Sequence, residues 1–174
     1  MRARQEDAFE AFAREFIRRH RGPRPLWPIE RILVATDFSL CSLTALEYAE
    51  ELARRFDAEL LLLHADELPL AGSEMAGATH AVAERELART IQQLRDDHLE
   101  ARSLLRRGAP AVVILEAAEN EPASLIVMGI HGRRGAAHPM GSVAERVVRG
   151  APCPVLTVVR RKDGRVTPTG RIPR

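Results

Sequence analysis

The residues best suited to bind a ligand lie in a glycine-rich segment in the second half of the chain. Gly129 and Gly132 follow an apolar run, and Gly141-Ser142 precede a helix-like stretch. Glycines after a buried strand let the backbone turn sharply and approach a ligand closely. The first N–H groups of a helix attract an anion, and Arg133 adds positive charge. The spacing predicts a phosphate-binding loop; the alternative is an ordinary strand-to-helix connection capped by Ser142.

A second candidate follows the apolar run 32–35, where Thr36-Asp37 precede another helix-like stretch. Asp37 can accept hydrogen bonds from a ribose hydroxyl or an adenine amino group, or it can help to cap the following helix. In parallel sheets, ligands bind at the carboxyl ends of the strands, where strand order reverses. The two loops are therefore expected to border one crevice.

No residue is assigned as catalytic or as a metal ligand. His64 and His131 have no Ser or Cys nucleophile partner in the pattern, and His131 is expected to offer its backbone amide. The two cysteines, Cys41 and Cys153, show no CxxC or Cys/His metal spacing. Cys41 falls in the first turn of a helix, where a thiolate is stabilised, so it is a redox candidate. Cys153 is interpreted as a small buried filler.

Strand-like and helix-like segments alternate through most of the chain, which predicts a doubly wound α/β domain with a parallel sheet and helices on both faces. Strands are expected at 32–35, 59–64, 99–106, 124–128 and 155–159, and helices after Ser39 or Ser42 and at 79–97, 110–119 and 141–149, with a loop at 66–78.

Composition divides the chain into three parts. Residues 1–28 hold an amphipathic helix at 5–20 and a proline-rich linker, residues 29–160 the α/β domain, and residues 161–174 a basic tail expected to be disordered. The helix is expected to carry phenylalanines along one face, which would dock on its own domain or on a dimer mate. The alternatives are that this face binds another protein or a membrane surface.

Charge and hydropathy narrow the function classes. The net charge is +3 in residues 1–24, +5 in 160–174 and −6 between them. A nucleic-acid binder is expected to carry its basic patch on the folded domain, so nucleic acid is not a predicted partner. The charged N-terminus lacks an apolar leader, and no apolar run reaches the roughly 20 residues that a transmembrane helix needs. A cytoplasmic protein without a transmembrane segment is expected.

Four segments in order resemble the universal stress protein family: Ile32–Ser39, Gly129–Arg133, Gly141–Glu145 and Ala151–Leu156. The resemblance runs from about Glu30 to Arg160. It implies a single domain with a five-stranded parallel sheet of order 3-2-1-4-5. It also implies a cytoplasmic homodimer, often paired through the last strand, here 155–159.

One branch of that family binds ATP through a Gly-x-x-Gly, nine-residue spacer, Gly-Ser/Thr signature. The resemblance then implies phosphate contacts at Gly129, His131, Gly132, Gly141, Ser142 and Val143, beside the charge of Arg133. Adenine and ribose are implied near Ala35, Thr36, Asp37, Ala65 and Met128, and Mg²⁺ could accompany the ATP. This sequence departs from the signature, because residues 133–140 make a spacer of eight.

Three functions follow from these observations. The first is a stress-response regulatory protein that binds an adenine nucleotide, with ATP favoured, and acts through dimer or partner contacts. The second is a dimeric interaction module of the same family that has lost the nucleotide, as the short spacer suggests. The third is an enzyme such as a slow ATPase. It is ranked lowest, because Asp37 is the one acidic residue expected near the glycine loop.

Overall fold

The computed structural model describes residues 28–67, 75–132, 140–160 and 166–169. The elements along the chain are β1 (Arg31–Thr36), α2 (Leu40–Phe56), β2 (Glu59–Asp66), α3 (Met75–Asp96), β3 (Ala101–Arg107), α4 (Pro110–Asn120), β4 (Leu125–Gly129), α5 (Ser142–Gly150), β5 (Val155–Arg160) and β6 (Val166–Thr169). The expected helix 5–20 lies outside the described residues. Helix α3 begins at Met75, inside the stretch 66–78 that was expected to be a loop. The glycine in its first turn lowers helix stability by only about 1 kcal/mol relative to alanine, so it does not prevent the helix from starting there.

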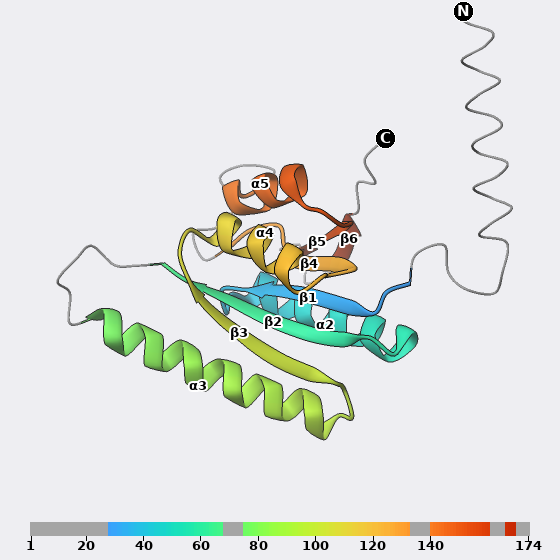
Figure 1. The fold of residues 1–174 in the computed structure, drawn as a ribbon, viewed down its shortest axis with the longest axis horizontal. Coiled ribbons are helices and arrows are strands. Elements are labelled where there is room, and N and C mark those ends of the chain that lie inside the picture. Colours follow the sequence, from blue (N-terminus) through green and yellow to red (C-terminus); the bar gives the residue numbers. More distant parts are fainter. Residues whose placement is uncertain (1–27, 68–74, 133–139, 161–165, 170–174) are drawn as a thin grey trace, which may run out of the picture.

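The sheet has the strand order β3-β2-β1-β4-β5-β6 (Figure 1). The first five strands are parallel neighbours, which confirms the predicted order 3-2-1-4-5. Strand order reverses between β1 and β4, where Ala35 is in register with Met128. The carboxyl ends of these two strands therefore form the crevice in which a ligand is expected.

Residues 166–169 of the tail that was expected to be disordered form a sixth strand, and the other residues of 161–174 lie outside the described part of the chain. Val166–Thr169 forms β6, which pairs antiparallel with β5. The edge of β5 that faces away from β4 is thus occupied within the chain. A dimer contact through the edge of 155–159, implied by the family resemblance, cannot form while β6 is in place.

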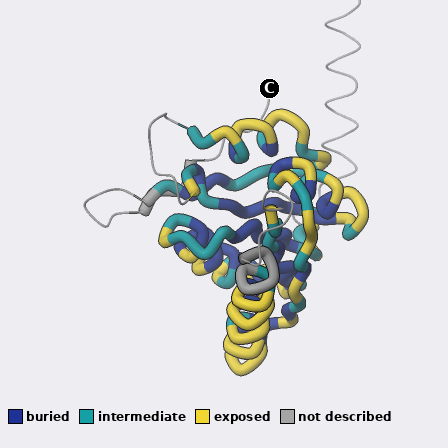
Figure 2. The backbone as a smooth tube through the Cα atoms, turned by 90° about the vertical axis from the view of Figure 1, so that its left-hand side faces the viewer, coloured by how far each residue is buried: buried dark blue, intermediate teal, exposed yellow. Residues whose placement is uncertain are grey.

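Two apolar cores lie on the two faces of the sheet. On one face, α2 and α3 pack against side chains that include Ile32, Val34, Leu60 and Leu62, all at most 1% exposed. On the other face, α4 and α5 pack against Leu33, Ala35, Leu61 and Leu63. Alternate strand residues face opposite sides, so strands covered on both faces must be apolar throughout. Figure 2 shows buried strands between helices whose outer sides are exposed.

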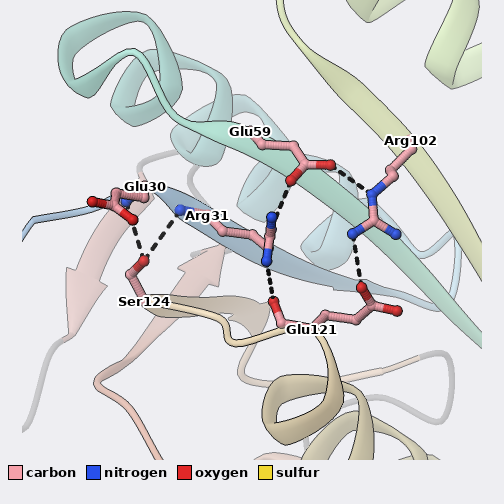
Figure 3. Close-up of polar contacts among 6 residues, drawn as sticks. All are labelled: Glu30, Arg31, Glu59, Arg102, Glu121 and Ser124. Atoms are coloured by element: carbon pink, nitrogen blue, oxygen red, sulfur yellow. Dashed lines mark hydrogen bonds and ion pairs between the residues drawn. The ribbon is translucent and has the colours of Figure 1, made fainter.

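A polar network closes the amino end of the face covered by α4 (Figure 3). The Glu59 carboxylate accepts a hydrogen bond from Arg31 Nε at 2.6 Å and another from Arg102 Nε. Arg31 also donates to the Glu121 carbonyl oxygen at 2.7 Å, and Arg102 to the Glu121 carboxylate at 2.7 Å. The Ser124 hydroxyl accepts the Arg31 N–H at 3.1 Å. The network ties β1, β2 and β3 to the end of α4, at the edge opposite the expected ligand site.

Gly108, between β3 and α4, lies where a side chain would be strained. Its φ is +142°, and an added Cβ would lie 2.9 Å from Val113 Cγ2. Replacement by alanine is expected to lower the free energy of unfolding by about 1–2 kcal/mol, measured by urea denaturation. The control is Ser103→Ala at an exposed position of β3, where a change below about 0.5 kcal/mol is expected. Equal urea midpoints for the two variants would contradict the strain argument.

Candidate functional site

The turn between β1 and α2 is organised by Ser39 and Asp37. Ser39 is the N-cap of α2, and its side chain accepts the Ser42 N–H. Asp37 Oδ1 accepts the Ser39 N–H at 3.1 Å. Ser39 therefore caps the helix, and Asp37 supports the turn that precedes it.

Buried hydroxyl groups and a histidine hold this turn in place. Phe38 has a φ of +60°, which is uncommon for a residue other than glycine. Its N–H donates to Thr36 Oγ1 at 3.0 Å, and Thr36 Oγ1 lies 3.1 Å from Ser42 Oγ. His64 Nδ1 lies 2.8 Å from the Thr36 carbonyl oxygen, and the His64 ring lies against Phe38 with centroids 4.6 Å apart. His64 thus has the structural role that the sequence indicated.

The glycine loop after β4 approaches this turn closely. A Cβ placed on Gly132 would lie 2.7 Å from Asp37 Oδ2. A Cβ on Gly129 would lie 3.0 Å from the Cys41 backbone carbon and 3.1 Å from the Ser42 nitrogen. The absence of side chains at these two glycines is what lets the loop meet the start of α2. The structure therefore brings together the two candidate loops that the sequence identified.

The ends of the loop are joined at the start of α5. The Gly141 N–H donates to the Ile130 carbonyl oxygen at 2.9 Å. Gly141 is the N-cap of α5 and makes no side-chain cap bond. Ser142 is thus the first helical residue, with an exposed side chain, and is not the cap considered above. The first helical bond runs from the Glu145 N–H to the Gly141 carbonyl, so the amides ahead of Glu145 form the anion-attracting end of the helix.

The remaining predicted residues are positioned as follows. Ala35 and Met128 are the next-to-last residues of the neighbouring strands β1 and β4, and Gly129 is the last residue of β4. Ala65 is the next-to-last residue of β2, one strand further out. The side chain of Val143 packs partly on the core under α5. Its amide lies in the first turn of α5, ahead of the first helical hydrogen bond. His131 is half-buried beside Gly132, whereas Arg133 lies outside the described residues.

One polar pair near this edge of the sheet was missed by the sequence reasoning. Asp66, the last residue of β2, lies with its Oδ2 2.7 Å from His80 Nδ1 on α3. Glu84 Oε1 lies 3.5 Å from His80 Nε2, one helical turn further along. The i,i+4 spacing of His80 and Glu84 was a visible signal, but the link to Asp66 depends on how α3 packs. Among the described residues, no group of three or more His, Cys, Asp or Glu side chains could hold a metal ion.

Both cysteines lie in packing contacts within the domain. The Cys41 thiol donates to the Val158 carbonyl oxygen at 3.3 Å and lies against Gly129. Cys153 is half-buried and packs against the core under α4 and α5, so it is less enclosed than the predicted buried filler; partial burial raises the pKa of its thiol. Cys41 fills the contact between α2 and the ends of β4 and β5. Within the part of the chain that the structure describes, no helix is both long and apolar enough to cross a membrane.

Residues 28–159 match the model of the universal stress protein family. Universal stress protein MJ0531 of Methanocaldococcus jannaschii is 34% identical over 142 residues, which cover 76% of this chain and 84% of that protein.

Solved structures show the same fold. UspA of Lactobacillus plantarum superimposes with a TM-score of 0.69 at 25% identity, over 74% of this chain and 97% of that one. A family protein of Arabidopsis thaliana with AMP bound gives a TM-score of 0.61 at 24% identity, over 77% and 94% of the two chains. A universal stress protein in complex with cAMP gives 0.56 at 25% identity, over 75% and 97%. With the family model matched across the whole α/β domain, the chain belongs to the universal stress protein family.

Proposed function

We propose that this protein binds an adenine nucleotide, with ATP favoured, between the β1–α2 turn and the β4–α5 loop. The observation that carries the proposal is the close approach of Gly132 to Asp37, where an added Cβ would lie 2.7 Å from the carboxylate. A carboxylate that can accept from ribose or adenine thus lies beside a glycine loop suited to phosphates. A ligand that has both groups, separated by a few bonds, matches this arrangement.

Different site residues would bind different parts of the nucleotide. Asp37 accepts from a ribose hydroxyl or the adenine amino group, beside the apolar ends of the strands at Ala35 and Met128. The backbone amides of the glycine loop and of Ser142 donate to phosphate oxygens, as does the exposed Ser142 hydroxyl. Gly141 lets the two ends of the loop pack together, because its N–H donates to the Ile130 carbonyl oxygen and a Cβ would lie 3.0 Å from that oxygen.

The kind of nucleotide is inferred from relatives and from the signature. Relatives that hold AMP or cAMP support an adenosine phosphate. ATP is favoured because the glycine signature resembles that of the ATP-binding branch of the family. Any Mg²⁺ would then be held chiefly by phosphate oxygens, because the described residues offer no cluster of metal-binding side chains.

The protein would act as a cytoplasmic stress-response regulator and not through catalysis. Binding would change dimer or partner contacts, and the helix expected at 5–20 stays the predicted element for a protein partner. No residue is assigned as catalytic, because Asp37 Oδ1 is used by the Ser39 N–H and the carboxylate supports the turn.

Isothermal titration calorimetry tests the proposal with ATP, ADP, AMP and cAMP, and with GTP to examine the base. Adenine nucleotides are expected to bind one per chain, and GTP more weakly. Gly141→Val should lower the affinity roughly tenfold or more, because a Cβ at Gly141 would lie 3.0 Å from the Ile130 carbonyl oxygen, a backbone atom that cannot move freely. Mass spectrometry of the purified protein would identify any nucleotide that copurifies.

The control is Gly150→Ala, at the other end of α5. There a Cβ would meet the tip of the Leu115 side chain at 3.1 Å, which can shift. This variant should bind nucleotides as the original chain does. No heat and no thermal shift with any of the nucleotides would instead support the nucleotide-free interaction module.

A further inference from the structure

Strand β3 forms the edge of the sheet on the side away from β6. The strand order places β3 first, and among the described residues it pairs only with β2 (Figure 1). An edge strand presents backbone N–H and C=O groups to which a second extended chain can bind by strand addition. The groups that β3 leaves available, and the charges beside them, determine which partner this edge can bind.

The direction of each β3 backbone group follows from its bonds to β2. The Leu60 N–H donates to the Glu100 carbonyl oxygen. The Gly108 N–H donates to the Asp66 carbonyl oxygen. Backbone groups alternate in direction along a strand, so the even-numbered residues between these two bonds face β2. The N–H and C=O groups of the odd-numbered residues therefore face outward, and these residues are Ala101, Ser103, Leu105 and Arg107.

Helix α3 already occupies the first part of this edge. Arg95, in the last turn of α3, donates through Nε to the Ala101 carbonyl oxygen at 3.1 Å. Further along, the outward backbone groups of Ser103, Leu105 and Arg107 are bonded to no other residue that the structure describes. The open edge therefore runs from Ser103 to Arg107, which is long enough to pair with an ordinary strand of about 5 residues.

The carboxyl end of the open edge is basic. Arg106 and Arg107 are both exposed, and neither lies within ion-pair distance of a carboxylate among the described residues. Two carboxylates near them bond other side chains instead: Asp66 is paired with His80 at 2.7 Å, and Glu121 with Arg102 at 2.7 Å. The edge thus combines available backbone groups with two cations that can bind carboxylates of a partner.

The two arginines lie on opposite faces of the sheet, because consecutive residues of a strand do so. Leu104 packs in the core under α4, and Leu105 packs against the core under α3. By alternation, Arg106 lies on the α4 side and Arg107 on the α3 side. A strand paired with the open edge can meet both arginines only with carboxylates on both of its own faces. Two consecutive acidic residues supply that arrangement.

We propose that the outer edge of β3 binds an extended segment of another protein that contains two consecutive acidic residues. Ser103, Leu105 and Arg107 supply the backbone hydrogen bonds of strand addition. Arg106 and Arg107 select the two carboxylates, one on each face of the sheet. Charged residues at an edge also disfavour pairing with a neutral, apolar strand. This inference does not depend on nucleotide binding.

A labelled synthetic peptide tests the proposal on the full-length chain. The peptide alternates threonine and valine around two consecutive glutamates, and a matched peptide has lysines in their place. Fluorescence anisotropy should show that the glutamate peptide binds at least about tenfold more tightly than the lysine peptide. At saturation, the glutamate peptide should slow hydrogen exchange of the Ser103, Leu105 and Arg107 amides at least about fivefold. The Leu104 and Arg106 amides face β2 and should change little.

Two double variants test whether the arginines of β3 make the selection. Arg106→Glu/Arg107→Glu should reverse the preference, so that the lysine peptide binds about tenfold more tightly than the glutamate peptide. Arg146→Glu/Arg149→Glu is the control, because it changes the net charge equally at exposed positions of α5. It should keep the preference of the original chain. Circular dichroism confirms that each variant is folded before comparison.

The proposal is overturned if neither peptide binds at about 1 mM, if both bind equally, or if the two double variants behave alike. Binding of the glutamate peptide without protection of the three outward amides would also overturn it, since the contact would then be ionic attraction without strand addition. Protection of these amides that rises with protein concentration in the absence of peptide has the same consequence, because a second copy would then occupy the edge.

Discussion

Replacing Gly132 with alanine is expected to lower the affinity for ATP by about tenfold to a hundredfold, which corresponds to about 1.4–2.8 kcal/mol. The added Cβ would lie 2.7 Å from Asp37 Oδ2, so the loop or the carboxylate must move. Asp37 cannot rotate away freely, because its other oxygen accepts the Ser39 N–H. Isothermal titration measures the affinity, and urea denaturation shows that the variant is folded.

A double-mutant cycle identifies the cause of that loss. Asp37→Ala alone should also weaken binding about tenfold, and adding Gly132→Ala should then cost little, because the carboxylate is already gone. Asp97→Ala is the control, since this exposed carboxylate follows α3, at the edge of the sheet opposite the site. Strictly additive losses would show that the two residues act separately, and unchanged affinity in both single variants would contradict the proposed site.

Replacing Glu59 with glutamine is expected to lower the free energy of unfolding by about 2 kcal/mol at neutral pH. Its side chain is 15% exposed and bridges two arginines, on β1 and β3. The variant replaces the carboxylate that Arg31 and Arg102 share with a neutral amide, and only their bonds to Glu121 remain. Urea denaturation at pH 7 measures the loss. Glu145→Gln, in an exposed pair with Arg149, is the control and should change the stability by less than about 0.5 kcal/mol.

The same pair of variants predicts a dependence on pH. Partial burial raises the pKa of Glu59, but hydrogen bonds from Arg31 and Arg102 outweigh it, and the net pKa is below the usual value of 4.5. A carboxyl whose pKa is lowered by folding contributes stability above its unfolded pKa and loses it as the pH falls through its folded pKa. The stability advantage of the original chain over Glu59→Gln should therefore shrink below about pH 4.5. An advantage that stays constant down to about pH 3 would show that the charge of Glu59 contributes nothing.

Most of the fold could be predicted from the sequence because its signals are local. Apolar runs such as Ile32–Ala35 and Leu60–Leu63 indicate strands buried on both faces, and the alternation with helices restricts the sheet to parallel, right-handed connections. The strand order itself came from the family resemblance and is confirmed. The positions of both candidate loops followed, because each loop directly succeeds a strand.

What the sequence by itself determined, then, is which residues end the strands and where glycine permits a turn. Only the tertiary structure decided which of those groups touch. Asp37 and Gly132 are almost a hundred residues apart, and their contact depends on β1 and β4 being neighbours. The link between Glu59 and Arg102, and that between Asp66 and His80, likewise cross between elements.

The tail shows the same division most clearly. A proline within Val166–Thr169 argues against a strand when only the local pattern is considered. In the folded chain, the bonds from β4 set which β5 groups face outward, and that register places Pro168 where no ladder bond is needed. Strand β6 therefore cannot be recognised from its own residues. The bonds between β5 and β4 decide which β5 backbone groups are available to it.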